Sequence, residues 1–230
     1  DLFHVIADAT HATNALEGDG PLGQGSRVRT PLALQLHSLR EEDTDNPGGK
    51  LRRIRALGYQ CIELAGRYDM PSKEWKRILE ETGLAVVGAH VPLEDLVGRF
   101  DEEVEFHHAI GNTRIVVPAV PKDSRVYDGF VRSALVLEQL GQGLVDNGLQ
   151  LLYHNHDFEF REFDDGRTGM DILFGGTDPD HVGFEIDVGW VETAGISAPE
   201  FLRENATRVR ALHLKEIRRR DGALVPIGQG

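Results

Sequence analysis

The chain has 230 residues, of which 40% are hydrophobic and 27% are charged, and 38 acidic against 25 basic residues give a formal net charge of −13. A chain of this length buries well over half of its unfolded surface, so it needs no covalent staples. The single cysteine, Cys61, excludes a disulfide framework and a thiolate zinc cluster, which fits a reducing compartment or a protein indifferent to redox conditions. We expect a cytoplasmic location. The acidic excess argues against nucleic acid as a partner, because phosphate binding needs clustered Lys and Arg. No apolar run approaches the roughly 20 residues that span a bilayer, so we expect no membrane partner.

The first 30 residues differ in composition from the rest. Residues 17–29 are mostly glycine and polar residues, which predicts a loop, so residues 1–30 are interpreted as an N-terminal extension or linker. Residues 2–7 form the only spare strand-like run in it. Residues 31–230 are predicted to be the catalytic domain.

Short apolar runs of strand length recur from residue 31 onward. Most are continuous, as expected for strands of a parallel sheet that is covered on both faces. The runs are Leu32–Leu36, Cys61–Leu64, Leu84–Gly88, Thr113–Val117, Leu149–Tyr153, Val182–Ile186 and Val209–Leu214. Between some of them lie predicted helices at 47–57, 72–82 and 127–147, each followed by a glycine.

This alternation of strands and helices predicts an α/β fold. It leaves two options, a (β/α)8 TIM barrel or an open doubly wound sheet. No Gly-x-Gly-x-x-Gly follows the first strand-like run, which lowers the dinucleotide-binding option. The sequence therefore favours the barrel.

Polar side chains concentrate at the carboxyl ends of the apolar runs. In a parallel barrel these ends surround one mouth. The residues are His37, Glu63, His90, His154, His156, Glu185, Asp187, His213 and Lys215. Because side chains alternate along a strand, two residues of one strand that are two positions apart point the same way. The sequence thus predicts a cluster of imidazoles and carboxylates at the mouth.

Histidine with carboxylates and no cysteine is a ligand set suited to Mn²⁺, Zn²⁺, Co²⁺ or Fe²⁺. Such an ion polarises a carbonyl beside a hydroxyl and stabilises an enediolate. Spare histidines or a lysine then move protons near neutral pH.

Four segments in succession resemble signatures of the sugar phosphate isomerase/epimerase family, in the xylose-isomerase-like TIM barrel superfamily. They are Tyr153-His154-Asn155-His156-Asp157-Phe158-Glu159-Phe160, Glu185-Ile186-Asp187-Val188-Gly189-Trp190, Leu212-His213-Leu214-Lys215-Glu216 and Ile227-Gly228-Gln229-Gly230. Residues 34–40 and 58–66 also resemble the first two strands of that family. The resemblance covers roughly residues 31–230.

The resemblance implies a divalent metal (Mn²⁺, Zn²⁺ or Co²⁺) held by His154, Asp187 and His213. Many relatives have a Glu at the position of His154 and use it as a proton-transfer base. This chain has His there, as the inosose dehydratases do, so a two-carboxylate epimerase mechanism is in doubt. Trp190 stands where several relatives have another His, which argues against a multi-zinc nuclease centre of the endonuclease IV kind. The eighth strand with its ligand Glu should follow Gly230, where the chain stops. The predicted fold is therefore a TIM barrel that lacks a C-terminal eighth strand, unless residues 2–7 supply one.

We assign proton transfer to His156, His90 and Lys215, with His156 also a candidate ligand. Substrate binding is assigned to the residues His37, Glu63, Glu185 and Trp190. Alternatives remain at several of these positions. Asp187 is also a candidate N-cap of the following helix, and Glu63 could pair with Lys215. His107 and His108, on an acidic helical segment, are expected on a solvated face.

The leading functional hypothesis is a metal-dependent isomerase or epimerase that acts on a small carbohydrate or a sugar-derived ketone. Abstraction of the α-proton would give a metal-stabilised enediolate. The alternatives are an inosose-dehydratase-like lyase, which begins with the same proton abstraction, and a catalytically silent sugar-binding barrel. A homo-oligomer is left open.

Overall fold

The structure is a computed structural model that describes residues 5–8, 32–40, 46–218, 220 and 222–229. Eight strands form a closed barrel in the order β1-β2-β3-β4-β5-β6-β7-β8. The strands are β1 (Val5–Asp8), β2 (Leu32–Gln35), β3 (Cys61–Ala65), β4 (Ala85–His90), β5 (Arg114–Val117), β6 (Gln150–His154), β7 (Val182–Asp187) and β8 (Val209–Leu214). The seven strands predicted from residue 31 onward are therefore all present.

Strands β2 to β8 run parallel to one another. The barrel is closed by β1, which pairs antiparallel with both β2 and β8, and Ile6 lies opposite Ala33 on one side and His213 on the other. The prediction of a TIM barrel without a C-terminal eighth strand is confirmed, and part of the spare N-terminal run fills the gap. The predicted loop at 17–29 lies outside the described residues, and the domain boundary at residue 30 stays a prediction.

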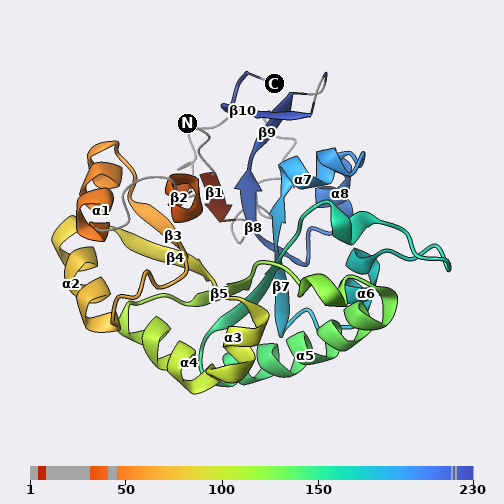
Figure 1. Ribbon diagram of the computed structural model, residues 1–230, viewed down its shortest axis with the longest axis horizontal. Coiled ribbons are helices and arrows are strands. Elements are labelled where there is room, and N and C mark those ends of the chain that lie inside the picture. The colour runs from red at the N-terminus through yellow and green to blue at the C-terminus, as the bar shows by residue number, and fades with distance from the viewer. Residues whose placement is uncertain (1–4, 9–31, 41–45, 219, 221, 230) are drawn as a thin grey trace, which may run out of the picture.

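Helices surround the barrel, with α1, α2, α4 and α5 forming much of the outer layer (Figure 1). Short 3-10 helices lie at Leu36–Leu39 (η3), Lys122–Ser124 (η4) and Phe158–Phe160 (η5). The α-helices are α1 (Pro47–Ala56), α2 (Ser72–Thr82), α3 (Leu93–Gly98), α4 (Phe100–Ala109), α5 (Tyr127–Asp146), α6 (Gly169–Gly175), α7 (Val188–Thr193) and α8 (Ala198–Glu204). The three predicted helices correspond to α1, α2 and α5, two of them one residue shorter than predicted.

Helix α2 illustrates why the sequence folds this way locally. Its buried residues are Trp75, Ile78, Leu79 and Thr82, a spacing that places them on one face of a helix. The helix ends at Gly83, whose φ of 66° is in the left-handed region, and glycine adopts this conformation without steric cost. The face packs onto strands β2 to β4 in one of two large apolar cores.

The inside of the barrel holds a small apolar layer made by Ala33, Cys61, Val116, Leu152 and Ala211. Two residues further along four of these strands stand Gln35, Glu63, His154 and His213, all buried. Side chains two positions apart share a face of a strand, so these polar residues form the next interior layer, toward the mouth. The fold thus places these polar residues between the apolar layer and the mouth of the barrel.

Beyond β8 the chain forms a two-stranded hairpin of β9 (Glu216–Arg218) and β10 (Ala223–Val225). Among the described residues, no helix combines the length and the apolar character that crossing a bilayer requires.

Candidate active site

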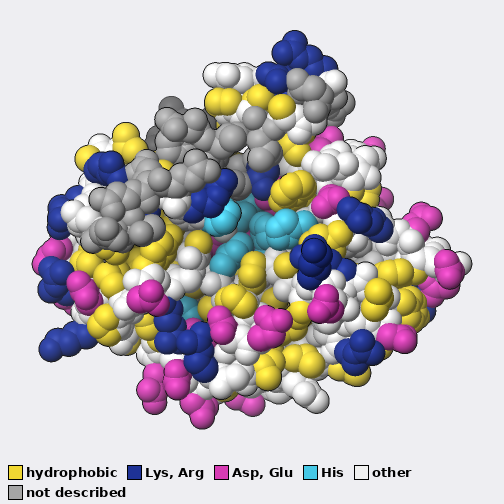
Figure 2. Space-filling model, in the orientation of Figure 1, with side chains coloured by type: hydrophobic (Ala, Val, Ile, Leu, Met, Phe, Trp, Pro, Cys, Tyr) yellow, Lys and Arg dark blue, Asp and Glu magenta, His cyan; other side chains and the backbone are white. Residues whose placement is uncertain are grey.

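Histidine side chains gather at the centre of the face shown in Figure 2. At the heart of this cluster, one carboxylate oxygen, Glu185 Oε2, lies within hydrogen-bond distance of three imidazoles. The distances are 2.9 Å to His90 Nε2, 3.1 Å to His154 Nδ1 and 3.0 Å to His213 Nε2. The residues come from β7, β4, β6 and β8, so the cluster joins strands from both halves of the barrel.

A second buried carboxylate, Glu63 of β3, joins the same cluster. Its Oε2 lies 2.9 Å from His213 Nε2 and 3.3 Å from His90 Nε2. The neighbouring strand makes room with Gly88, where an added Cβ would come within 2.7 Å of Glu63 Oε1. The strand pairing shifts register at Glu63 and again at Glu185, and such irregularities re-aim side chains near active sites.

A third carboxylate, Asp187, lies on the other side of the same two histidines. Its Oδ2 is 4.0 Å from His154 Nε2 and 4.0 Å from His213 Nδ1. This oxygen is buried and accepts no hydrogen bond of regular geometry from the described residues. The ammonium of Lys215, 2.8 Å away, supplies its counter-charge. Lys215 thus pairs with Asp187, whereas Glu63 contacts histidines.

The other oxygen of Asp187 fixes the carboxylate in place. Oδ1 accepts hydrogen bonds from the backbone N–H groups of Gly189 (3.0 Å) and Trp190 (3.2 Å), and so caps the N-terminus of α7. Asn155 also holds this segment, because its Oδ1 accepts from Asp187 N at 2.9 Å. The N-cap alternative for Asp187 is therefore confirmed, and it leaves the second oxygen facing the histidines.

Burial and neighbouring charges separate the two histidines electrostatically. Burial opposes charge on His213, but the carboxylates of Glu185 and Glu63 outweigh it and raise the pKa of His213 well above its usual value. Burial and the charge of His213 lower the pKa of His154 to about 3. At neutral pH His154 is therefore neutral, and its Nδ1–H donates to Glu185.

The two buried glutamates also differ. At Glu185, burial is outweighed by His213 and by hydrogen bonds from the histidines, which hold its pKa well below the usual range. Burial and the nearby Glu185 charge raise the pKa of Glu63, against the opposing effects of His90 and His213. Glu185 is thus the ionised partner of the cluster.

His156 lies beyond the end of β6, half-buried between aromatic rings. Its ring centroid is 5.6 Å from that of Phe158 and 5.6 Å from that of Trp190. Its Nδ1 is buried and has no hydrogen-bond partner among the described residues. Burial, together with the charges of Lys215 and Arg125, lowers the pKa of His156 to about 4 despite the opposing charge of Asp187. His156 is therefore a neutral imidazole at the mouth.

The loop that carries His156 is held by a buried glutamate, Glu159. Its Oε2 accepts from the backbone N–H of His156 at 2.8 Å and its Oε1 accepts from Tyr153 Oη at 2.7 Å. Burial outweighs these hydrogen bonds and raises the pKa of Glu159 to about 7. Glu159 is a group that sequence reasoning did not assign, although it stands inside the segment that carries the family resemblance.

The structure brings most of the predicted site residues together. Trp190 lies beneath the Lys215 ammonium, 4.6 Å from the ring centroid. His37 lies in η3 and is exposed, and among the described residues no hydrogen bond or ion pair joins it to the cluster. Its pKa is lowered by partial burial and by the charges of Arg40, His90 and Lys215.

The structure differs from the sequence interpretation at two residues outside the predicted site, His107 and Gln35. His107, expected on a solvated face, is 1% exposed, because its side of α4 faces the loop after β3. Gln35, which the sequence interpretation passed over, places its Nε2 at 3.2 Å from His90 Nε2. Gln35 stands two residues after Ala33, whose side chain faces the barrel interior. Strand alternation therefore places Gln35 on the same interior face.

Residues of this site fit a divalent cation. A metal-bound histidine usually donates its other ring N–H to a carboxylate, which fixes the tautomer. His154 and His213 both place one nitrogen against Glu185 and the other toward Asp187 Oδ2, and Lys215 shows that this oxygen takes a positive charge. A different grouping, His90, His154, Glu185 and His213, brings four ligand atoms within 4.8 Å of one another.

Residues 51–230 match the profile of a protein family described as xylose isomerase-like TIM barrel. Among curated proteins, the inosose dehydratase of Lacticaseibacillus casei is 26% identical over 182 residues, which cover 70% of this chain and 60% of the relative. The inosose dehydratase of Clostridium botulinum (strain Alaska E43 / Type E3) is 26% identical over 195 residues, with 73% and 62% covered. The chain thus spans about 60% of the length of these relatives.

Solved structures share the fold at lower identity. A sugar phosphate isomerase/epimerase from Parabacteroides distasonis has a TM-score of 0.66 at 23% identity, covering 76% of this chain and 71% of its own. A probable 3-DHS dehydratase from Bacillus anthracis has a TM-score of 0.63 at 14% identity, with 80% and 73% covered. The IOLI protein with a bound zinc atom has a TM-score of 0.58 at 13% identity, with 76% and 69% covered.

Proposed function

The chain belongs to the xylose isomerase-like TIM barrel family, and from this premise we propose that it is a metal-dependent lyase acting on a hydroxylated ketone derived from a sugar or cyclitol. In the proposed reaction a base removes the proton from the carbon beside the ketone, and the hydroxyl on the next carbon leaves as water. The product is an unsaturated ketone. The two curated relatives described above are inosose dehydratases, which supports dehydration over the isomerisation that the sequence favoured.

One observation carries the proposal. His154 and His213 face Glu185 with one nitrogen, at 3.1 and 3.0 Å, and Asp187 Oδ2 with the other, at 4.0 Å. Separations of about 3 Å are those of hydrogen bonds. Separations of about 4 Å leave room for an ion with bonds of roughly 2.0–2.2 Å to each ligand. The Asp187 side is therefore the proposed cation position.

We assign the ligands to His154, Asp187 and His213. Glu185 and Glu63, which the sequence interpretation assigned to substrate, are instead proposed to orient the two histidines through their hydrogen bonds. His90 belongs to the same hydrogen-bonded group, because its Nε2 contacts both carboxylates. Mn²⁺, Zn²⁺ and Co²⁺ all suit such a set of imidazoles and a carboxylate. A bound ion supplies polarisation of the ketone oxygen, which stabilises the negative charge that develops there.

Proton transfer is assigned to His156 and Lys215. A neutral His156 has a nitrogen able to accept the α-proton. The electron pair of the broken C–H bond is then shared with the ketone oxygen as an enolate. Lys215 is proposed to give a proton to the departing hydroxyl, so that water leaves as the carbon–carbon double bond forms. Trp190, between these two side chains, is proposed as a surface for the substrate ring, and His37 is proposed to line the rim.

The test is a panel of keto-inositols and ketoses incubated with the protein and Mn²⁺ in deuterium oxide. We expect an unsaturated ketone, followed by its ultraviolet absorbance, and loss of activity in His156→Gln and Lys215→Met. Deuterium at the α-carbon without loss of water would contradict the lyase and support the isomerase. No turnover together with the absence of a stoichiometric ion would support a catalytically silent sugar-binding barrel.

A further inference from the structure

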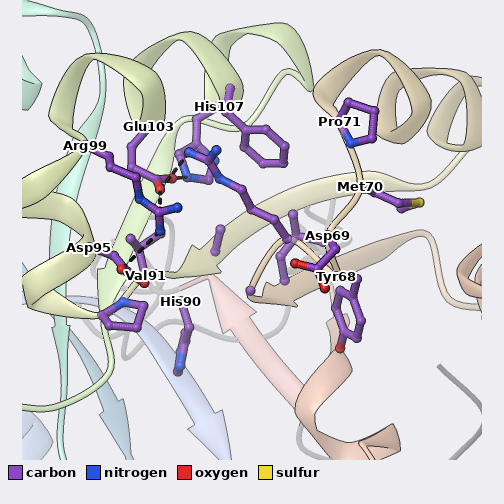
Figure 3. Close-up of a pocket in the computed structure, with 16 residues that line it drawn as sticks. Tyr68, Asp69, Met70, Pro71, His90, Val91, Asp95, Arg99, Glu103 and His107 are labelled. Atoms are coloured by element: carbon purple, nitrogen blue, oxygen red, sulfur yellow. Dashed lines mark ion pairs between the residues drawn. The ribbon is translucent and has the colours of Figure 1, made fainter.

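A cavity of 480 Å³ lies beside the histidine cluster, between the loop that follows β3 and the helices α3 and α4 (Figure 3). Its volume is in the range of small-molecule sites. His90 joins the two regions, because it lines the cavity while its Nε2 lies 2.9 Å from Glu185 Oε2. In Figure 3 the His90 ring points away from Glu103 and His107. The cavity therefore adjoins the candidate active site, and His90 is part of both.

A charged network forms one wall of the cavity. Arg67 Nη2 lies 2.6 Å from Glu103 Oε1, and Arg99 Nη2 lies 3.1 Å from Asp95 Oδ1 and 3.9 Å from Glu103 Oε1. Burial tends to raise the pKa of Glu103, but the close contacts with His107 and Arg67 and the charge of Arg67 hold it below its usual value. Both guanidinium groups are thus already paired with carboxylates.

His107 reinforces this network from beneath. Its Nδ1 lies 3.1 Å from Asn112 Nδ2, which is a donor, so the ring proton is on Nε2. That nitrogen is 3.4 Å from Glu103 Oε2. Neither atom has a hydrogen bond of regular geometry among the described residues, and both side chains are 1% exposed. Two buried polar atoms at the wall are therefore incompletely satisfied.

The opposite wall is a strained loop. Tyr68 and Asp69 have φ values of 52° and 51°, a left-handed conformation that is uncommon for a tyrosine. The turn is fixed by Trp75, whose Nε1 donates to Arg67 O at 2.9 Å. Strain of this kind persists where surrounding structure enforces it, and it often accompanies ligand-binding sites. The conformation presents the Asp69 carboxylate, which is exposed, at the rim.

The chemistry of the walls favours an uncharged, hydroxyl-bearing ligand. The cavity is lined by two arginines and three carboxylates, which are Arg67, Arg99, Asp69, Asp95 and Glu103. A phosphate in the cavity would therefore meet no excess of positive charge. A hydroxyl accepts from a guanidinium and donates to a carboxylate at once, so it can bind beside these paired groups without needing an excess of either charge. Apolar residues on the cavity floor suit the C–H face of a ring. They are Leu64, Ala89 and Val91.

We propose that this cavity is a second subsite, which binds an uncharged polyol ring attached to the ring that reacts at the histidine cluster. The substrate is then a two-ring compound, such as a glycosylated cyclitol ketone. This inference rests on the proposed function and adds the class of substrate to it.

The test measures binding by calorimetry, without turnover, to myo-inositol, to galactosyl-myo-inositol and to myo-inositol monophosphate. We expect the two-ring probe to bind at least about tenfold more tightly than myo-inositol. Met70→Trp, which fills the cavity from its lining, should abolish that gain and leave myo-inositol binding unchanged, and Met70→Leu is its control. Asp69→Asn, which keeps a residue tolerant of the left-handed conformation, should weaken only the two-ring probe, by several-fold.

Three outcomes would overturn the subsite. They are equal binding of the one-ring and two-ring probes, a gain only for the phosphate, and a gain that Met70→Trp leaves intact. Turnover of one-ring ketones with no preference for two rings would leave the lyase standing and remove the subsite. A two-ring preference in a protein that turns over no ketone would support the subsite and count against the lyase.

Discussion

His154 and His213 lie side by side with ring centroids 4.5 Å apart, and both rings bridge the same two carboxylates. Each directs one nitrogen to Glu185 and the other to Asp187. The pair therefore has a hydrogen-bonded side and an opposite side suited to an ion. The two carboxylates are on one strand, β7, two residues apart, so one strand sets both sides.

Asp187→Asn and Glu185→Gln should weaken metal binding to different extents. Loss of an orienting carboxylate typically costs roughly 10- to 100-fold in metal affinity, so we expect Glu185→Gln in that range and Asp187→Asn beyond it. Titration of the chelator-treated protein with Zn²⁺ measures both. Asparagine still caps a helix, so circular dichroism should show Asp187→Asn folded, and the same measurement checks the fold of Glu185→Gln. A larger loss in Glu185→Gln would instead assign the ion to His90, His154, Glu185 and His213.

Lys215→Met should make stability depend on a divalent ion. Lys215 and Asp187 are 8% and 0% exposed, and breaking a buried pair by removing one partner costs about 3–5 kcal/mol. We expect that loss in urea unfolding with chelator present. An ion at 100 times its Kd should restore about 2.7 kcal/mol. Arg161→Met, which removes an exposed partner of Asp157, is the control and should change stability by less than about 1 kcal/mol. Equal behaviour of the two variants would argue against a buried pair.

Glu159→Gln should flatten the pH dependence of stability. The pKa of Glu159 is raised from 4.5 to about 7 on folding, so the folded protein holds a proton that the unfolded chain releases. This contribution to stability is complete below pH 4.5 and is lost as the pH rises through 7. Relative to wild type, Glu159→Gln should gain roughly 2 to 3 kcal/mol in unfolding free energy between pH 5 and pH 8. Parallel wild-type and variant curves from urea unfolding across that range would refute the raised pKa.

Gly88→Ala should destabilise the barrel through Glu63. The new Cβ would lie 2.7 Å from Glu63 Oε1, and that side chain cannot move away without losing its contact with His213. Overpacking of this kind typically costs about 1–3 kcal/mol, measurable by chemical denaturation. Gly98→Ala is the matched control, since nothing lies within 4 Å of its Cβ. A loss of similar size in both variants would show that the effect does not come from Glu63.

Strand positions and the collection of polar residues at one mouth could be predicted from sequence, because each strand is a local apolar run and parallel strands share an orientation. Strand β1 could be noticed as spare, but its direction could not be predicted. Its antiparallel direction is set by pairing with β2 and β8, which are far apart in sequence, so no local sequence pattern predicts it.

The arrangement within the site was less accessible to the sequence. Alternation correctly placed Glu185 and Asp187 on one face of β7, but nothing local states that two imidazoles lie between their carboxylates. His107 was misjudged because its segment is acidic and looks solvated. In the structure Glu103, four residues earlier, is buried with it beneath Arg67, and Arg67 comes from a loop far away in sequence.

The cap that Asp187 gives to α7 would also limit how this carboxylate could hold the proposed ion. Oδ1 is held by two backbone N–H groups at 3.0 and 3.2 Å, and rotation of the carboxylate would remove both bonds from the helix end. An ion held by Asp187 would therefore be coordinated through Oδ2 alone while the helix stays capped. Calcium commonly uses bidentate carboxylates and six to eight oxygen ligands, whereas zinc accepts four ligands including imidazole. On the proposed ligand assignment, a helix terminus would thus favour zinc over calcium by limiting the denticity of Asp187, without contacting the ion.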